Sequence, residues 1–167
     1  TFNYTRGDGY YENYKAGKSF SKYLMNPPVV DGVEYDEGDF ITREALANDY
    51  YVLNSVLRYS DERLNLTTGL NLSRYDGDHI GKVLWNNILG DSFDYAGHNW
   101  YLNNGLKQEM SAFVRGEVIC CEGLTAFLDL QYRGVWLDMS GPEDDGVLLD
   151  HSDDWQFFNP CAGLSYR

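Results

Sequence analysis

Basic residues are scarce in this chain of 167 residues. It holds 13 Lys and Arg against 26 Asp and Glu, which gives a formal net charge of −13. Proteins that bind nucleic acid need a basic surface to neutralise phosphates. The composition therefore argues against nucleic acid as a partner.

Long apolar runs are also missing. No uninterrupted run approaches the roughly 20 residues that a transmembrane helix requires. The mean hydropathy of −0.47 does not exclude a membrane β-barrel, because only every second residue of a barrel strand faces lipid. The sequence shows no signal peptide, start methionine or targeting tail. Both termini lie in segments that alternate as strands do, so we expect both ends to be cut from a longer chain.

Residues that carry chemistry are few and scattered. The three cysteines, Cys120, Cys121 and Cys161, follow no ligand or disulfide spacing, so we interpret them as incidental thiols. The three histidines are dispersed, and no serine or cysteine lies in a nucleophile motif such as G-x-S-x-G. The sequence therefore predicts no catalytic residue, no cofactor and no enzyme activity.

A pattern with a period of two runs from residue 49 to residue 75. Leucines at positions 64, 66, 70 and 72 share one face, and in the preceding run Tyr51, Leu53, Leu57 and Tyr59 do the same. The polar turn Ser60–Arg63 between the runs predicts an antiparallel hairpin. Each strand is expected to be about eleven residues long, which at a tilt near 45° spans about 25 Å, the height of the apolar band of a membrane barrel.

Alternation recurs in residues 1–5, 107–119, 124–137 and 155–167. The connections between these strands are expected to be long over residues 15–48, 76–106 and 138–154, and short at Ser60–Arg63 and Cys120–Gly123. One helical turn is expected at Thr42–Leu46, with Thr42 as the N-cap. In an up-and-down antiparallel sheet the long connections then lie at one end, an asymmetry typical of outer-membrane barrels. The alternative is a soluble β-sandwich or a lipocalin-like barrel with its apolar faces turned inward.

Side chains on the two faces differ in kind. Tyrosines and tryptophans collect near the expected strand ends, where a membrane interface favours rings with one apolar and one wet end. These are Tyr4, Tyr51, Tyr59, Tyr75, Tyr132, Trp136, Trp155 and Tyr166. Charged residues fall on the opposite face and would point into a lumen, where they would contact one another, water and a plug. These are Arg58, Arg115, Arg133, Glu109, Glu117 and Asp129.

Several segments together resemble the barrel region of TonB-dependent outer-membrane receptors, especially those of Bacteroides-type bacteria. They occur in the same order as in that family and cover nearly the whole chain. The segments are 4–15, 71–81, 128–133, 157–160 and 162–167. The cysteines at 120, 121 and 161 depart from the polar or charged residues expected there.

The resemblance implies an all-β fold of about six antiparallel up-and-down strands, a single segment over residues 1–167 of a larger transmembrane β-barrel. Such barrels have about 22 strands around a plug, so the plug domain and the remaining strands would be partners. The implied place is the outer membrane of a Gram-negative cell, in contact with its lipid. The implied function is import of a scarce nutrient, such as an iron-siderophore, cobalamin or a glycan. The isolated piece is expected to self-associate, or to fold into a different compact β form, because its edge strands and lipid-facing side chains would otherwise be exposed.

Aromatic residues in the expected extracellular connections are the candidates for ligand contact, although they could equally pack the loops together. They are Tyr10, Tyr11, Trp85, Trp100 and Tyr101. The acidic stretch from Glu143 to Asp154 could bind calcium, but it lacks the EF-hand spacing. The run Asp76–His79 could hold a metal, but a glycine-centred turn explains it equally well. We therefore predict no metal site. The alternative function is a soluble β-sheet module that binds carbohydrate with the same loop aromatics.

Overall fold

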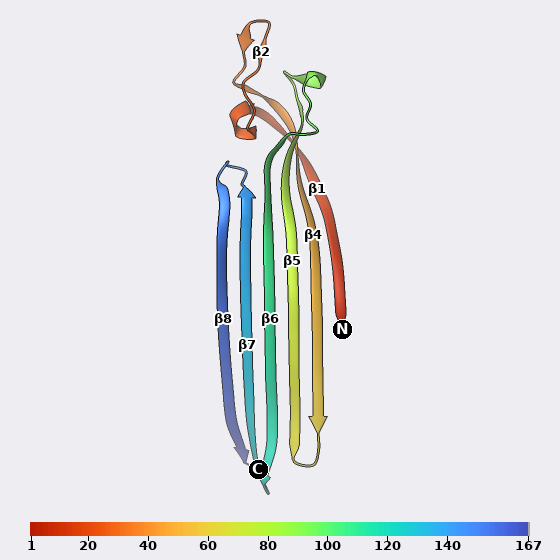
Figure 1. Cartoon of the computed structure of the whole chain (residues 1–167), viewed down its shortest axis with the longest axis vertical. Coiled ribbons are helices and arrows are strands. Elements are labelled where there is room, and N and C mark those ends of the chain that lie inside the picture. Colours follow the sequence, from red (N-terminus) through yellow and green to blue (C-terminus); the bar gives the residue numbers. More distant parts are fainter. Residues whose placement is uncertain (167) are drawn as a thin grey trace.

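The computed structural model describes residues 1–166 as an all-β protein with six long antiparallel strands in one sheet. The strand order is β1-β4-β5-β6-β7-β8, so each long strand pairs with the next long strand in the chain (Figure 1). The short strands β2 and β3 form a separate hairpin between β1 and β4. The long strands are β1 (Phe2–Ser19), β4 (Glu37–Ser60), β5 (Leu64–Asn86), β6 (Asn99–Cys121), β7 (Leu124–Pro142) and β8 (Leu148–Tyr166). The predicted up-and-down sheet is confirmed.

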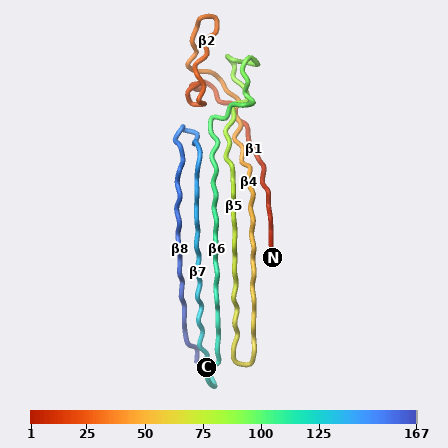
Figure 2. The backbone as a smooth tube through the Cα atoms, in the orientation of Figure 1, coloured from red at the N-terminus to blue at the C-terminus, as the bar shows by residue number. Residues whose placement is uncertain are grey.

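Three connections lie at one end of the sheet and two tight turns at the other (Figure 2). The first connection contains the 3-10 helix η1 (Phe20–Tyr23) and the hairpin of β2 (Val29–Val30) and β3 (Val33–Glu34). The second contains the 3-10 helix η2 (Gly90–Ser92). No helix in residues 1–166 is long and apolar enough to cross a membrane.

The predicted hairpin between residues 49 and 75 is confirmed, and its turn has a clear local cause. The Asp61 carboxylate accepts hydrogen bonds from the backbone N–H groups of Arg63 and Leu64, both at 2.8 Å. The backbone N–H of Asp61 also donates to the carbonyl of Leu64 at 2.9 Å. These bonds close the chain on itself over three residues, so the two strands pair in register directly from the turn.

The strands are about twice as long as predicted, and the connections are correspondingly shorter. The strands of the hairpin have 24 and 23 residues instead of about eleven. The connections occupy residues 20–36, 87–98 and 143–147, so the third is a short loop and not the long acidic one expected. The expected helical turn at Thr42–Leu46 is wrong, because this segment pairs with β1 on one side and β5 on the other. Hydrogen bonds to two neighbouring strands outweigh a local helical preference.

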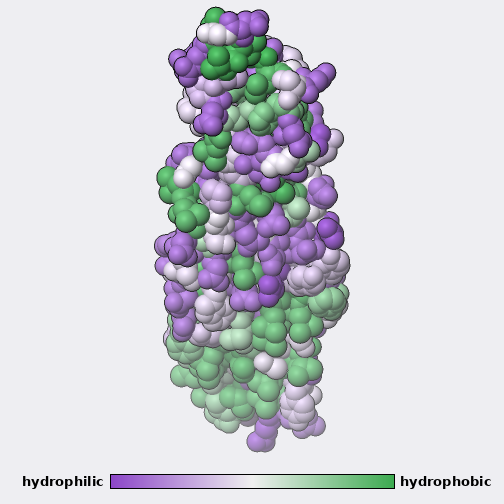
Figure 3. All heavy atoms as spheres, turned by 45° about the horizontal axis from the view of Figure 1, so that its top comes forward, coloured by the Kyte–Doolittle hydropathy of each residue, from purple (hydrophilic) through white to green (hydrophobic). Residues whose placement is uncertain are grey.

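The alternating apolar sets predicted for separate strands all lie on one face of the sheet. The register places Leu57, Thr68, Val114, Leu130 and Pro160 in a single row across five strands. Similar rows repeat from the level of Leu64 to the level of Tyr51 and its partner Arg74, and we call them together the apolar band. Many of its side chains are exposed, including Leu57 at 68% and Leu164 at 74%. The apolar band forms the green lower part of the surface in Figure 3.

The opposite face, which we call the polar face, carries the charged residues that the sequence assigned to it. Arg133 donates to Glu109 at 2.9 Å, and Lys107 pairs with the same carboxylate at 2.6 Å. Arg115 lies opposite Asp129 in the register of β6 and β7. The two faces therefore differ sharply over the part of the sheet nearest the tight turns.

A compact cluster of buried side chains lies at the end of the sheet that carries the long connections, and we call it the loop core. It joins the first two connections to the upper ends of β4, β5 and β6. Its buried members are Phe20, Tyr23, Met25, Phe40, Val83 and Trp100. The ring centroids of Tyr23 and Phe40 are 4.6 Å apart, and those of Tyr23 and Trp100 are 5.2 Å apart. His98 hydrogen-bonds through Nε2 to the carbonyl of Tyr23 at 2.6 Å, which ties one connection to the other.

Candidate functional site

One depression lies on the polar face, at a height along the strands between that of the apolar band and that of the loop core. Its larger part has a volume of about 630 Å³ and spans β1, β4, β5 and β6. A second part of about 300 Å³ continues toward β7 and β8, and His79 lines both parts. We call the two parts together the glycine hollow.

Glycines in adjacent strands create the floor of the glycine hollow. The register aligns Gly7, Asn48, Gly77 and Gly105 in one row across four strands. No atom lies within 4 Å of the position that a Cβ would take on Gly9 or Gly105. The side chains of Asn48 and Tyr75 instead lie over Gly7 and Gly77. The backbone of the sheet is therefore open to the hollow at Gly9 and Gly105.

Tyr11, Glu44 and Tyr101 form the rim of the hollow nearest the loop core. They lie in one row across four strands, in which Tyr11 pairs with Glu44, Glu44 with Gly81, and Gly81 with Tyr101. The Tyr11 hydroxyl donates a hydrogen bond to the Glu44 carboxylate, and this bond raises the pKa of Tyr11. Burial, helped by the charge of Glu44, raises the pKa of Tyr101 to about 12. Both phenols are therefore neutral near pH 7.

Only two of the five aromatic residues predicted to contact ligand belong to this hollow by their side chains. Tyr11 and Tyr101 point to it, whereas Tyr10 alternates to the other face, where its ring lies 4.2 Å from the Arg43 guanidinium carbon. Trp100 is buried in the loop core, and Trp85 is a half-buried strand residue paired with Ile41. All five lie in strands, so their predicted placement in the loops is wrong. Alternation was obscured there because both faces of these strand ends carry polar and aromatic residues.

Sequence reasoning missed Glu44, His79 and the glycine floor. The signal was present in the spacing of Gly7 and Gly9, two positions apart and hence on one face of a strand. That spacing predicts a floor only together with the strand register that places Gly77 and Gly105 in the same row as Gly7, and the sequence alone does not give this register.

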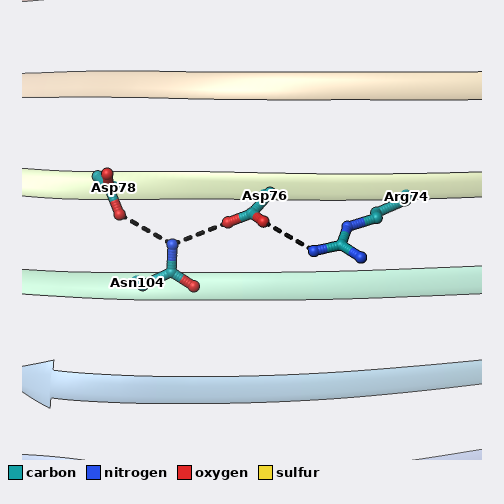
Figure 4. Close-up of polar contacts among 4 residues, drawn as sticks. All are labelled: Arg74, Asp76, Asp78 and Asn104. Atoms are coloured by element: carbon teal, nitrogen blue, oxygen red, sulfur yellow. Dashed lines mark hydrogen bonds and ion pairs between the residues drawn. The ribbon is translucent and has the colours of Figure 1, made fainter.

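The run Asp76–His79 lies within β5, so the glycine-centred turn expected there is wrong. The side-chain amide of Asn104 donates to Asp76 at 2.9 Å and to Asp78 at 2.8 Å, and Arg74 donates to Asp76 at 3.1 Å (Figure 4). These contacts lie on the face opposite His79, so the carboxylates and the imidazole do not converge. The acidic residues 150–154 are likewise spread along β8. Within residues 1–166, no group of three or more His, Cys, Asp or Glu is arranged to hold a metal ion.

The three cysteines are exposed and have free thiols. Cys161 lies opposite Asp129 on the polar face, while Cys120 and Cys121 end β6 beside the tight turn.

No family model, curated protein or solved structure matches this chain. Its function must therefore be inferred from its own residues and their arrangement.

Proposed function

We propose that this chain forms part of the wall of a transmembrane β-barrel in a Gram-negative outer membrane, as a segment of a TonB-dependent receptor that imports a nutrient. The apolar band is the observation that carries the proposal. From Leu64 to Arg74 it covers ten residue steps, about 33 Å along a strand and about 25 Å at a tilt of 40°. That height equals the apolar band of an outer-membrane barrel, about 25 Å.

Aromatic side chains at the limits of the apolar band support the same assignment. Tyr4 and Tyr51 stack at 4.9 Å, and the row that they share reaches Trp136 on β7. Tyr59 and Tyr166 lie near the other limit, beside the tight turns. Rings with one apolar and one wet end concentrate at the two membrane interfaces of such barrels.

The large solvent-accessible area of the chain supports burial of the apolar band in lipid. The chain exposes 11,283 Å². A compact monomer of this mass exposes about 8,400 Å² by the scaling of surface with mass. The excess arises because the sheet has a single layer and neither of its faces is covered. Lipid on the apolar face, and a lumen with a plug on the polar face, would cover both.

The orientation follows from the connections. Outer-membrane barrels have short periplasmic turns and longer extracellular loops. The turns at residues 61–63 and 122–123 would then face the periplasm, and the loop core and the glycine hollow would lie on the extracellular side. Tyr11 and Tyr101 would meet the nutrient there, with the plug domain and the remaining barrel strands as partners. The resemblance to TonB-dependent receptors suggests an iron-siderophore, cobalamin or a glycan as the nutrient.

Thiol labelling on β7, an inner strand that pairs with β6 and β8, tests the proposal. The background carries Cys120→Ser, Cys121→Ser and Cys161→Ser, and single cysteines are introduced as Leu130→Cys on the apolar face and Gln131→Cys on the polar face. The purified chain is reconstituted in phospholipid vesicles and exposed to a membrane-impermeant maleimide.

We expect Gln131→Cys to react at least ten times faster than Leu130→Cys in vesicles, and the two to react alike after unfolding in urea. Equal labelling in vesicles would contradict the membrane assignment. A soluble carbohydrate-binding module would then become the better account of the fold.

A further inference from the structure

The glycine hollow has a lining that selects among ligand chemistries. Its floor is bare backbone at Gly9 on β1 and at Gly105 on β6. Two strands separate these positions, so they lie about 15 Å apart at the usual spacing of paired strands. The hollow therefore has room for several linked rings lying along the sheet.

Tyrosine rings border this floor on both sides. The Tyr101 ring covers Gly81, since its Cε1 lies 2.3 Å from the position that a Cβ would take there. The Tyr75 side chain covers Gly77 in the same way, with its hydroxyl 2.6 Å from that position. Both rings thus lie close to the sheet and present aromatic surface to the hollow. Aromatic faces of this kind pack against the C–H face of a saturated ring, and the phenol hydroxyls bond to its polar edge.

The charges of the lining disfavour an anionic ligand. Lys107 is the cationic side chain among the lining residues, and Glu109 engages it at 2.6 Å. Glu44 and Glu143 add two carboxylates. A phosphate, sulfate or carboxylate would be repelled by these groups and would find no unpaired cation. A ligand rich in hydroxyl groups would instead find the imidazole of His79, the amide of Asn103 and the carboxylate of Glu44.

We propose that the glycine hollow binds a neutral oligosaccharide. Its sugar rings lie over the open backbone at Gly9 and Gly105, against the rings of Tyr101 and Tyr75, and its hydroxyl groups bond to His79, Asn103 and Glu44. The inference rests on the proposed function only for the side from which the sugar arrives, because the lining itself is the same in a membrane or in water.

Substitutions that fill the hollow test this assignment without straining the sheet. Gly9→Leu and Gly105→Leu place a side chain in open space, since nothing lies within 4 Å of either Cβ position and neither glycine has a positive φ. Gly97→Leu is the matched control, because it meets the same conditions in the connection before β6, outside the lining. Circular dichroism of all three variants verifies that the sheet is retained.

Isothermal titration of the full chain, in one detergent, uses neutral hexasaccharides of glucose, mannose and xylose, with hexagalacturonate as the anionic probe and cyanocobalamin as a neutral ligand of another class. We expect at least one neutral hexasaccharide to bind, and hexagalacturonate to bind at least tenfold more weakly. Gly9→Leu and Gly105→Leu should each weaken binding at least tenfold, while Gly97→Leu should leave it within twofold.

Binding of hexagalacturonate or cyanocobalamin in place of the neutral sugars would overturn the proposal, as would the failure of every hexasaccharide to bind. Sugar binding that survives both filling variants would overturn the assignment to the hollow. The thiol-labelling result is separate from these outcomes. Equal labelling of Leu130→Cys and Gln131→Cys together with sugar binding in the hollow would refute the barrel and leave this inference standing.

Discussion

At three places on the polar face an aromatic ring lies over the glycine directly opposite it on the neighbouring strand. The pairs are Gly69 with Phe113, Gly81 with Tyr101, and Gly163 with Phe127. A ring in this position covers backbone that the glycine would leave open to water, and such pairs stabilise sheets. Each glycine is therefore required by its partner and not by its own backbone conformation, since none of the three has a positive φ.

A larger side chain at Gly69 should destabilise the sheet. A Cβ there would lie 2.2 Å from Cε1 of Phe113, so the ring must leave its place. We expect Gly69→Val to lower the free energy of unfolding by about 1–3 kcal/mol, the usual cost of overpacking. Urea titration in detergent, followed by circular dichroism, measures the change.

Gly116→Val is the matched control for this prediction, because the nearest atom to its Cβ position is Leu66 Cδ1 at an ordinary 3.8 Å. It should be neutral or slightly stabilising, since β-branched residues suit strands. Equal losses at Gly69 and Gly116 would show that the Phe113 contact is not the cause.

Asp61 should make the stability of the β4–β5 turn depend on pH. Hydrogen bonds from the backbone N–H groups of Arg63 and Leu64, with the Tyr59 hydroxyl, hold the pKa of the Asp61 carboxyl below its usual value. A lowered folded-state pKa means that the stabilisation is fully present above the unfolded value, about 3.9, and is lost as the pH falls through the folded value.

The test of Asp61 compares the wild-type chain with Asp61→Asn by thermal unfolding in detergent between pH 2 and pH 7. We expect Asp61→Asn to be less stable at pH 7, and the gap between the two proteins to shrink once the pH falls below about 4. A gap that stays constant over this range would rule out the carboxylate as its source.

At the scale of the strand, alternation in the sequence was informative only where the two faces of the sheet differ. Leu64, Leu66, Leu70 and Leu72 alternate with polar residues, and this stretch was correctly predicted as a strand with its apolar side identified. Above the apolar band both faces carry polar groups, as at Asp49, Asp76 and Tyr75. A strand with similar surroundings on both sides has no period-two signal, so the sequence predicts loops where the upper halves of the strands lie.

The loop core was not foreseen, because its members come from two connections and three strands that only the register brings together. Asn86 shows the kind of contact involved. It is fully buried, its side-chain amide donates to the carbonyl of Asp39 at 3.0 Å, and its side-chain oxygen accepts from Ile88 and Leu89. A polar residue at such a position is indistinguishable in sequence from a surface asparagine.

Removing the Asn86 side chain should weaken the loop core. Asn86→Ala leaves the backbone N–H groups of Ile88 and Leu89 without their partner, while the carbonyl of Asp39 keeps only its bond from the N–H of Asn87. We expect the free energy of unfolding to fall by about 1–3 kcal/mol. Asn71→Ala, which removes an exposed amide bonded to Asn54, should change it by less than about 0.5 kcal/mol. Tryptophan fluorescence during urea titration reports the change, since Trp100 lies in the loop core. Comparable effects of the two substitutions would contradict the structural role given to Asn86.

At the scale of the whole molecule, two free strand edges and an uncovered apolar band determine behaviour in water. β1 and β8 each pair on one side only within the sheet. Unpaired edges and exposed apolar patches both promote association. The all-β sheet and its order could be predicted from the sequence, whereas the absence of a second layer became evident only from the structure.

Light scattering of the purified chain in detergent-free buffer measures this tendency. We expect a mass well above 19.1 kDa, or precipitation, and a smaller and uniform species once detergent covers the apolar band. A clean monomer without detergent would mean that the apolar faces close on each other, and the soluble module would become the preferred function.

The upper half of the sheet has a consequence for reach. Beyond the level of Tyr51, β4 continues for fourteen residue steps to Glu37, about 46 Å along the strand and about 35 Å in height at a tilt of 40°. In the proposed membrane setting, the hydrogen-bonded upper half of the sheet thus holds the loop core well above the lipid surface. Large bodies arriving from outside, such as antibodies or phage, would therefore touch the loop core first. Small solutes would still have to pass along the upper half of the sheet before they reached the level of the lipid.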